Sequence, residues 1–361
     1  MALHPVAPSY AVNIMVQPTG SWSRDLALYR RRVLEDPGLD AGELTDALRT
    51  AYGVEATGFS FVPGYDMHAA SYGVATSDGG AFAKLRYGPV ATTPLDVPRA
   101  LLDAGVSNVL APIRTLTSTL WHPMGDGRTL VLYPFVAGKN AMVAGMTADQ
   151  WRMFGTALRT VHDSGLEEQF ADRLPAETFD LPSAGVVRAV LAQHPSVNSP
   201  AADRLHALLL ESHGPIAAML DRAEELATRL GERSFAHVLC HADIHAANLL
   251  VADDGRILLV DWDGTMLAPR ERDLLFVIGS RIARAVEPHE EAWFFEGYGD
   301  VEVVREAIVY YRYERVLEDI GEFGLSVFGD PALPESSRES QVELAESFFA
   351  PGGIVETVER V

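Results

Sequence analysis

The sequence predicts an α+β fold made of two parts, a small antiparallel β-sheet followed by a larger, mainly helical region. Three observations indicate this. Short aromatic and β-branched segments alternate with turn residues over residues 56–87. Apolar residues at helical spacing dominate after residue 137. A polar cluster flanked by two short strands then interrupts the helical region at residues 237–264.

Length and composition fit such a chain. Its 361 residues exceed the roughly 250–300 at which single hydrophobic cores stop growing, so two domains or one large one are expected. With 48% hydrophobic and 22% charged residues, the chain is neither disordered nor a coiled coil. We divide it into an N-terminal extension at residues 1–33, a first lobe at 34–136 that binds nucleotide, and a second lobe at 137–361 that is catalytic and binds substrate.

Charge and cysteine content exclude several classes of partner. The chain has 50 acidic and 29 basic residues, a formal charge of −21, which repels nucleic acid and anionic lipid and favours small cations. Cys240 is the one cysteine, so no intrachain disulfide forms. No apolar run reaches the roughly 18–20 residues of a membrane span, and no signal peptide is evident. We expect a cytoplasmic protein, either a monomer or a homodimer.

The elements of the first lobe follow from local signals. Residues 25–33 and 41–51 suit helices, and the second helix has Asp40 as N-cap and Gly53 as its stop. An antiparallel meander follows, then a helix near residues 96–103. The strand candidates are GFSFV, AASYGVAT, GAFAKLRY, VLAPIRTL and TLVLYPFV.

The second lobe begins with a helix after Thr147, a good N-cap. This helix carries Trp151, Phe154, Leu158 and Val161 on one face. A short helix at residues 184–193 and a long one at 215–230 come next, and several helices follow the polar cluster. A β-rich piece joined to a larger helical piece is the two-lobed arrangement of kinases.

The polar cluster contains the groups that phosphoryl transfer needs. In the segment HADIHAAN, Asp243 precedes Asn248 by five residues, the interval found in the kinase catalytic loop. Asp243 would then be the catalytic base and Asn248 a metal ligand. Asp261 follows Asn248 after an ADDG hairpin turn and would be the second ligand, because Mg²⁺ prefers hard oxygen donors.

The first lobe supplies candidate nucleotide contacts. Lys84 is central in an alternating strand, as expected for a lysine on the α- and β-phosphates. The segment PGYDMHAASYG replaces a glycine-rich loop, so backbone amides with Ser71 and Tyr72 would cover the phosphates. Tyr133 and Phe135 end the last strand and would form the adenine-binding hinge. The acid that holds Lys84 is left open between two candidates, Asp96 and Asp103.

A zinc site is the alternative interpretation of the cluster, because His241, Asp243 and His245 alternate as metallohydrolase ligands can. That interpretation leaves Asn248 and Asp261 without a role. His241 is expected to brace the loop instead, and His245 to pack there or contact substrate. Asp273 is expected to accept backbone N–H groups of the loop.

These residues carry a family resemblance. HADIHAANLL followed by LVDWDG resembles the aminoglycoside phosphotransferase and choline kinase superfamily, which has a bilobal protein-kinase-like fold. The segments DWDGTMLAPRERDLLF, FFEGYGDVEV and YYRYERVLEDI are similar to the spectinomycin 9-O-phosphotransferases. The resemblance implies transfer of the ATP γ-phosphoryl group to a spectinomycin hydroxyl, with Asp243 as base, Asn248 and Asp261 on Mg²⁺, and Lys84 on the phosphates.

Spectinomycin carries two secondary ammonium groups, so its pocket should present carboxylates. Asp263 is the first candidate, and His245 is a further possible contact. Glu314 and Glu318 lie on one helix face, where a solvated ion-pair surface is the alternative. Tyr298 would line the pocket or fill the core. Two competing functions remain: a kinase of a related amino-sugar or aminocyclitol intermediate, and a nucleotide-binding pseudokinase, although no proposed catalytic group is missing.

Overall fold

The computed structural model describes residues 39–62, 69–77, 79–125, 127–331 and 333–360. These residues form two compact units. Unit 1 contains the described residues as far as Gly145 together with Ala247–Asp263, and unit 2 contains Met146–Ala246 and the described residues from Gly264 onward. The expected N-terminal extension, with its helix at residues 25–33, lies outside the described residues.

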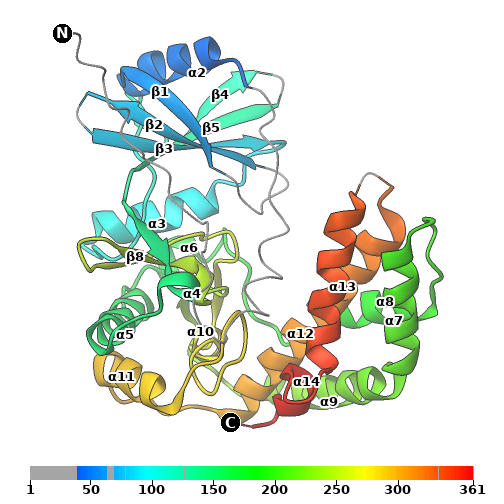
Figure 1. The fold of residues 1–361 in the computed structure, drawn as a ribbon. Helices are drawn as coiled ribbons and strands as arrows, with labels where there is room; N and C mark the ends of the chain where they lie inside the picture. The colour runs from blue at the N-terminus through cyan, green and yellow to red at the C-terminus, as the bar shows by residue number, and fades with distance from the viewer. Residues whose placement is uncertain (1–38, 63–68, 78, 126, 332, 361) are drawn as a thin grey trace. The chain divides into compact units, whose positions relative to one another are not determined.

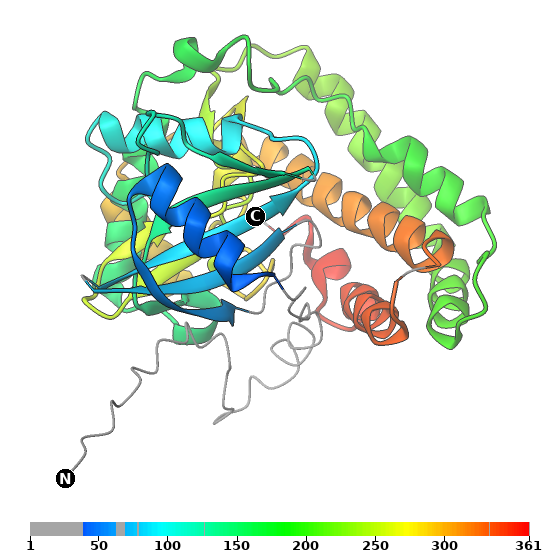
Figure 2. The same ribbon diagram turned by 90° about the horizontal axis from the view of Figure 1, so that it is seen from above.

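A five-stranded antiparallel sheet is the centre of unit 1, in the order β1-β2-β3-β5-β4. It confirms the predicted meander. Figures 1 and 2 show helix α2 lying across one face of this sheet. The strands are β1 (Ala56–Val62), β2 (Ala69–Thr76), β3 (Gly79–Tyr87), β4 (His122–Gly125) and β5 (Arg128–Pro134).

The predicted N-cap Asp40 and the predicted helix stop Gly53 of unit 1 are confirmed. Asp40 caps α2 (Ala41–Ala47), accepting the Gly42 amide at 2.7 Å. The π-helical turn η1 (Leu48–Tyr52) ends at Gly53, whose φ of 68° is left-handed. Leu44 and Leu48 bury their side chains against Leu85 and Leu132 of the sheet. Helix α3 (Thr93–Asp103) fulfils the prediction near residues 96–103.

The predicted strand VLAPIRTL is wrong. Residues 110–115 form no strand, and only Val109 makes an isolated bridge, to Leu259. The segment instead gives single backbone bonds to two different partners, Leu110 N to Leu259 O and Ile113 N to Leu132 O. Its apolar residues pack as an irregular connection, which a burial pattern alone does not distinguish from a strand. The fifth strand is β4.

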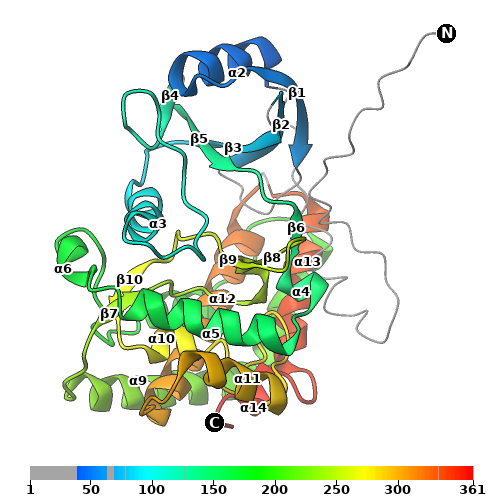
Figure 3. The same cartoon turned by 90° about the vertical axis from the view of Figure 1, so that its left-hand side faces the viewer.

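A second, three-stranded sheet completes unit 1. Its antiparallel order is β6-β8-β9, so residues 247–263 join the same unit as Gly138–Asn140. Figure 3 shows α4 beside β6 and β8. The elements are β6 (Gly138–Asn140), α4 (Ala141–Ala144), the 3-10 turn η2 (Ala246–Asn248), β8 (Leu249–Ala252) and β9 (Ile257–Leu259).

Unit 2 is mainly helical, as predicted. The short strands β7 (Val238–Cys240) and β10 (Met266–Ala268) pair antiparallel within it. The helices are α5 (Ala148–His162), α6 (Glu167–Phe170), α7 (Ser183–Ala192), α8 (Pro200–Glu211), α9 (His213–Gly231), α10 (Glu271–Leu274), α11 (Pro288–Tyr298), α12 (Arg305–Gly329), α13 (Glu335–Phe349) and α14 (Ile354–Thr357).

Helices α5 and α11 lie side by side (Figure 1). Thr147 caps α5 in a capping box with Gln150, as the sequence predicts. A Cβ at Gly155 would lie 2.1 Å from the Phe294 carbonyl oxygen, and one at Gly297 would lie 2.0 Å from that of Arg152. Two glycines therefore allow the backbones to approach closely.

Helix α12 is the long helix of unit 2 and packs against α7, α9 and α13; it is the long orange helix of Figure 2. Most of its residues are buried as far as Phe328. Among the described residues, no helix combines the length and the apolar composition that crossing a membrane requires.

Candidate active site

The backbone of the proposed catalytic loop is held in place where the loop follows strand β7. Asp273 of α10 accepts the His241 amide at 2.9 Å with Oδ2 and the Ala242 amide at 2.6 Å with Oδ1. Ala242 has a φ of 64°, a left-handed conformation that costs free energy in a residue with a Cβ. Asp273 offsets that cost, as the sequence leads us to expect, and so fixes the chain entering Asp243.

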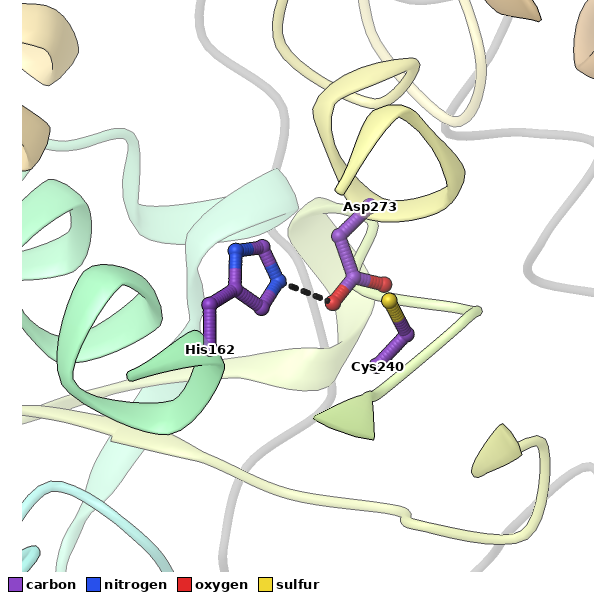
Figure 4. Close-up of side chains that lie close together, drawn as sticks. All are labelled: His162, Cys240 and Asp273. Atoms are coloured by element: carbon purple, nitrogen blue, oxygen red, sulfur yellow. Dashed lines mark hydrogen bonds and ion pairs between the residues drawn. The ribbon is translucent and has the colours of Figure 1, made fainter. Parts of the chain in front are cut away.

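The buried side chain of His162 holds Asp273, as Figure 4 shows, and Tyr298 in turn holds His162. His162 Nε2 lies 2.9 Å from Asp273 Oδ2, and its Nδ1 lies 2.7 Å from the Tyr298 hydroxyl. Because a carboxylate only accepts, Nε2 donates to Asp273, and in a neutral imidazole Nδ1 is then the acceptor for the Tyr298 hydroxyl. Burial alone would raise the pKa of Asp273, but the bonds from His162 and His241 lower it below its usual value, so the clamp is ionised.

Cys240 joins His162 and Asp273 in the one group of three potential metal ligands among the described residues. Both Asp273 oxygens already accept loop amides, and burial raises the pKa of the Cys240 thiol. A neutral thiol near the Ala268 and Pro269 carbonyl oxygens is a packing group. The trio His241, Asp243 and His245 of the zinc interpretation does not converge in the described part of the chain.

Asp243 lies between two nitrogen-bearing side chains of unit 2. Arg315 Nη1 of α12 is 3.2 Å from Oδ1, and His245 Nε2 is 3.5 Å from Oδ2. Although burial raises the pKa of Asp243, the interactions with His245 and Arg315 prevail and lower it. The carboxylate is therefore ionised at neutral pH, which the acceptor of a hydroxyl proton requires.

The β8–β9 hairpin brings together the chain around Asn248 and Asp261 in unit 1. The strands pair in register through Leu249 and Leu259, and the Val260 amide donates to the Asn248 carbonyl oxygen at 3.0 Å. The hairpin turn predicted at ADDG is confirmed. Asn248 is buried, and Asp261 has a φ of 65°. An amide and a carboxylate, both hard oxygen donors, fit a Mg²⁺ ion.

Strand β3 carries two cationic residues on one side. Lys84 is opposite Ser71 of β2 and Val131 of β5 in register, and Ala83 and Leu85 on the other side are buried. Two residues beyond Lys84, Arg86 Nη2 lies 2.6 Å from Asp263 Oδ2. The first candidate for a substrate carboxylate thus has a guanidinium partner.

The remaining nucleotide candidates are Tyr72 of β2, Tyr133 at the end of β5, and Phe135 just after it. Tyr72 is buried in the core of the sheet, with its ring 5.6 Å from that of Phe61. The segment at residues 63–68 lies outside the described part of the chain. Burial raises the pKa of the Tyr133 phenol despite nearby Arg86. Phe135 follows β5 and packs over Gly80.

The two candidate acids on α3 now differ. Asp103 is bound by Arg99 and lies 2.7 Å from Arg114 Nη2. The bonds from these guanidinium groups lower its pKa. Because Asp103 is already paired with two arginines, Asp96, in the first turn of the same helix, is the candidate that we keep for the Lys84 partner.

The acidic candidates on α12 have different environments. Glu314 is buried and paired with Arg272, whose guanidinium lies 5.1 Å from the Tyr311 ring centre. Burial raises the pKa of Glu314. Glu318 is half-buried on the same helix. Tyr298, with its hydroxyl on His162, is 1% exposed, so it lies in the core of unit 2.

The sequence reasoning missed Arg315 and Arg86, the partners of two of the predicted carboxylates. No local signal identifies such partners, since they are 72 and 177 residues from Asp243 and Asp263. The position of Arg86, two residues after Lys84 on the same strand, indicates only that the two side chains share a face of the sheet.

Comparison with known proteins gives concordant results. Residues 96–308 match the phosphotransferase enzyme family. Spectinomycin phosphotransferase APH(9)-Ia, solved with ADP and spectinomycin, is 29% identical with a TM-score of 0.81, covering 90% of this chain and 98% of that chain. The AMP-bound complex of the same enzyme is also 29% identical, with a TM-score of 0.79, and the match covers 90% of this chain and 99% of that chain. These similarities confirm the predicted resemblance and the predicted kinase-like α+β fold.

A curated relative is similar over a shorter stretch. Protein StrN of Streptomyces griseus is 27% identical over 187 residues, which is 49% of this chain and 57% of StrN. The match therefore spans little more than half the length of that relative.

Proposed function

Because the chain belongs to the phosphotransferase enzyme family, we propose that it transfers the γ-phosphoryl group of ATP to a hydroxyl of spectinomycin or a related cationic aminocyclitol. The enzyme class, a small-molecule O-phosphotransferase, follows from the family. Support for the acceptor comes from the 29% identity to spectinomycin phosphotransferase APH(9)-Ia across 90% of this chain. A kinase that consumes ATP is expected in the cytoplasm.

The observation that carries the chemistry is that Asp243 is ionised and follows a backbone segment held by hydrogen bonds to Asp273. In the proposed reaction the acceptor oxygen bonds to the γ-phosphorus while the bond from that phosphorus to the β,γ-bridging oxygen breaks. ADP leaves, and the hydroxyl proton passes to Asp243. The transition state of such transfers is loose, so orientation of the hydroxyl matters more than base strength.

The remaining catalytic groups have separate roles. Asn248 and Asp261 would hold Mg²⁺, which neutralises phosphate charge when bound. Lys84 would bind the α- and β-phosphates, oriented by Asp96, and Ser71 would assist on the neighbouring strand. The end of β5, with Tyr133 and Phe135, would receive adenine. Tyr72 lies in the core and is assigned no phosphate contact.

The acceptor is expected to meet acidic groups on α12. Glu318 retains exposed surface there and could pair with a substrate ammonium group. His245, which lies close to Asp243, would contact the acceptor. Asp263 and Glu314 each already have an arginine partner, so they rank below Glu318 as substrate ligands.

Mass spectrometry of spectinomycin after incubation with the protein, Mg²⁺ and ATP tests this proposal. A gain of one phosphate is expected, and the phosphorylated position follows from NMR of the product. A panel of related aminocyclitols run in parallel identifies the preferred acceptor. If ATP is bound but neither spectinomycin nor any panel member is phosphorylated, the proposed function is wrong and a pseudokinase becomes the better interpretation.

A further inference from the structure

Arg315 extends from α12 onto the carboxylate of Asp243, with Nη1 at 3.2 Å from Oδ1. We propose that Arg315 is a positioning residue that orients Asp243 toward the acceptor hydroxyl. The inference rests on the proposed function for the identity of the hydroxyl, but the contact itself belongs to unit 2 alone.

The rotation of α12 about its axis is fixed by two buried groups just before Arg315. Arg312, one turn earlier, donates to the carbonyl oxygens of Val358 at 3.1 Å, Arg360 at 2.9 Å and Ile278. Glu314, the preceding residue, is paired with Arg272. Because these buried groups hold the helix, Arg315 is presented toward the catalytic loop.

A second carboxylate lies beside the guanidinium. Arg315 Nε lies 3.5 Å from Asp319 Oδ1, one helical turn further along α12. The guanidinium thus lies between two carboxylates, and its planar fork suits two contacts at once. A lysine ammonium would keep the charge but would not reproduce both contacts.

The two oxygens of Asp243 have different partners as a result. Oδ1 is 3.2 Å from Arg315 and Oδ2 is 3.5 Å from His245. Because each oxygen has a partner on a different element, rotation of the carboxylate about its Cβ–Cγ bond is opposed, so the carboxylate keeps a fixed orientation. Orientation of this kind is what a loose transition state demands of the base.

The groups that influence Asp243 come from two elements. His241 and His245 belong to the loop itself, and Arg315 and Asp319 belong to α12. His245 and Arg315 favour the ionised carboxylate, whereas Asp319 opposes it. Removal of the Arg315 charge alone should therefore raise the pKa of Asp243.

The experiment compares Arg315→Gln and Arg315→Lys with Arg305→Gln, a matched loss of charge at an exposed residue of the same helix. Arg315→Gln should lower kcat for spectinomycin about 10- to 100-fold, with KM for ATP unchanged. In this variant, the fall of kcat/KM on the acidic side of its pH profile should occur at a higher pH than in the wild type. Arg315→Lys should restore the wild-type position of that fall and part of kcat. Arg305→Gln should behave as wild type.

Carboxyl ¹³C NMR titration, with the Asp243 signal assigned by Asp243→Asn, provides a readout that needs no acceptor. A higher pKa of Asp243 in Arg315→Gln, but not in Arg305→Gln, supports the inference even if spectinomycin is not the substrate. An unchanged Asp243 titration overturns it. So does a wild-type kcat and pH profile in Arg315→Gln when the wild-type enzyme phosphorylates spectinomycin.

Discussion

Arg86 Nη2 lies 2.6 Å from Asp263 Oδ2. This ion pair connects strand β3 to the segment that carries Asp261, within one unit. The side chains are 22% and 42% exposed, so the pair contributes little to folding stability, on the order of 0.2–1 kcal/mol. Its importance is positional, since it lies two residues from both Lys84 and Asp261.

We predict that Arg86→Gln and Asp263→Asn lower kcat/KM by similar factors and that the double variant is no worse than either one. Each change removes the same connection, so the effects should not add. Steady-state kinetics of the three variants measure this. If Asp263→Asn alone raises KM for spectinomycin, Asp263 binds the acceptor directly, as the sequence first suggested.

Asp243→Asn should lower kcat about 10²- to 10⁴-fold, because the amide cannot accept the hydroxyl proton. Nucleotide affinity should be retained. Asp253→Asn, in the exposed hairpin turn, provides the matched control. Turnover and the nucleotide-induced rise in Tm measure the two effects, and wild-type turnover in Asp243→Asn would contradict the proposed chemistry.

Asn248→Ala and Asp261→Asn should each raise the Mg²⁺ concentration needed for half-maximal rate by more than about 10-fold, since each removes an oxygen donor. Chelation by EDTA should abolish activity of the wild-type enzyme, and added Mg²⁺ should restore it. Titration of Mg²⁺ at saturating ATP measures the shift. Unchanged Mg²⁺ dependence in both variants would place the ion elsewhere.

Tyr298→Phe should destabilise the protein by about 1–3 kcal/mol, because it leaves the buried His162 Nδ1 without its donor. KM for spectinomycin should not change. Tyr313→Phe removes a less buried bond, to Glu359 at 3.0 Å, and should cost less. Urea unfolding and kinetics measure both effects. A raised KM in Tyr298→Phe would return this residue to the substrate pocket.

Burial raises the pKa of Asp319 from 3.8 to about 6, helped by Glu318, Glu322 and Asp243 and opposed by Arg315. A raised folded-state pKa favours the native state at low pH, and this contribution is lost as the pH rises from 3.8 through about 6. Asp319 therefore destabilises the folded protein at higher pH.

Asp319→Asn should accordingly raise the free energy of unfolding at pH 8 by up to about 3 kcal/mol and change it little near pH 4. Activity should fall, because Arg315 loses its ion pair with the Asp319 carboxylate. Urea unfolding at both pH values, with Asp253→Asn as control, measures the stability change. Equal stability of wild type and Asp319→Asn at pH 8 would show that Asp319 carries no such cost.

Local features were predictable because their causes are local. The caps at Asp40 and Thr147 and the hairpin turn after β8 depend on residues within one turn of the chain. The spacing of Asn248 and Asp261 about that hairpin follows from the same short stretch. The irregular course of residues 110–115 was not predictable, since it depends on partners in two distant strands.

The amino-acid sequence alone indicated which groups could perform the chemistry, because the residue types and their short spacing are those of the proposed base, the two proposed oxygen ligands and the proposed phosphate-binding lysine. Only the tertiary structure decided which charges meet. Arg315 and Asp243, Arg86 and Asp263, and His162 and Asp273 are 72, 177 and 111 residues apart. A charged residue has many possible partners on the chain, and helix and sheet packing selects one of them by placing it within reach.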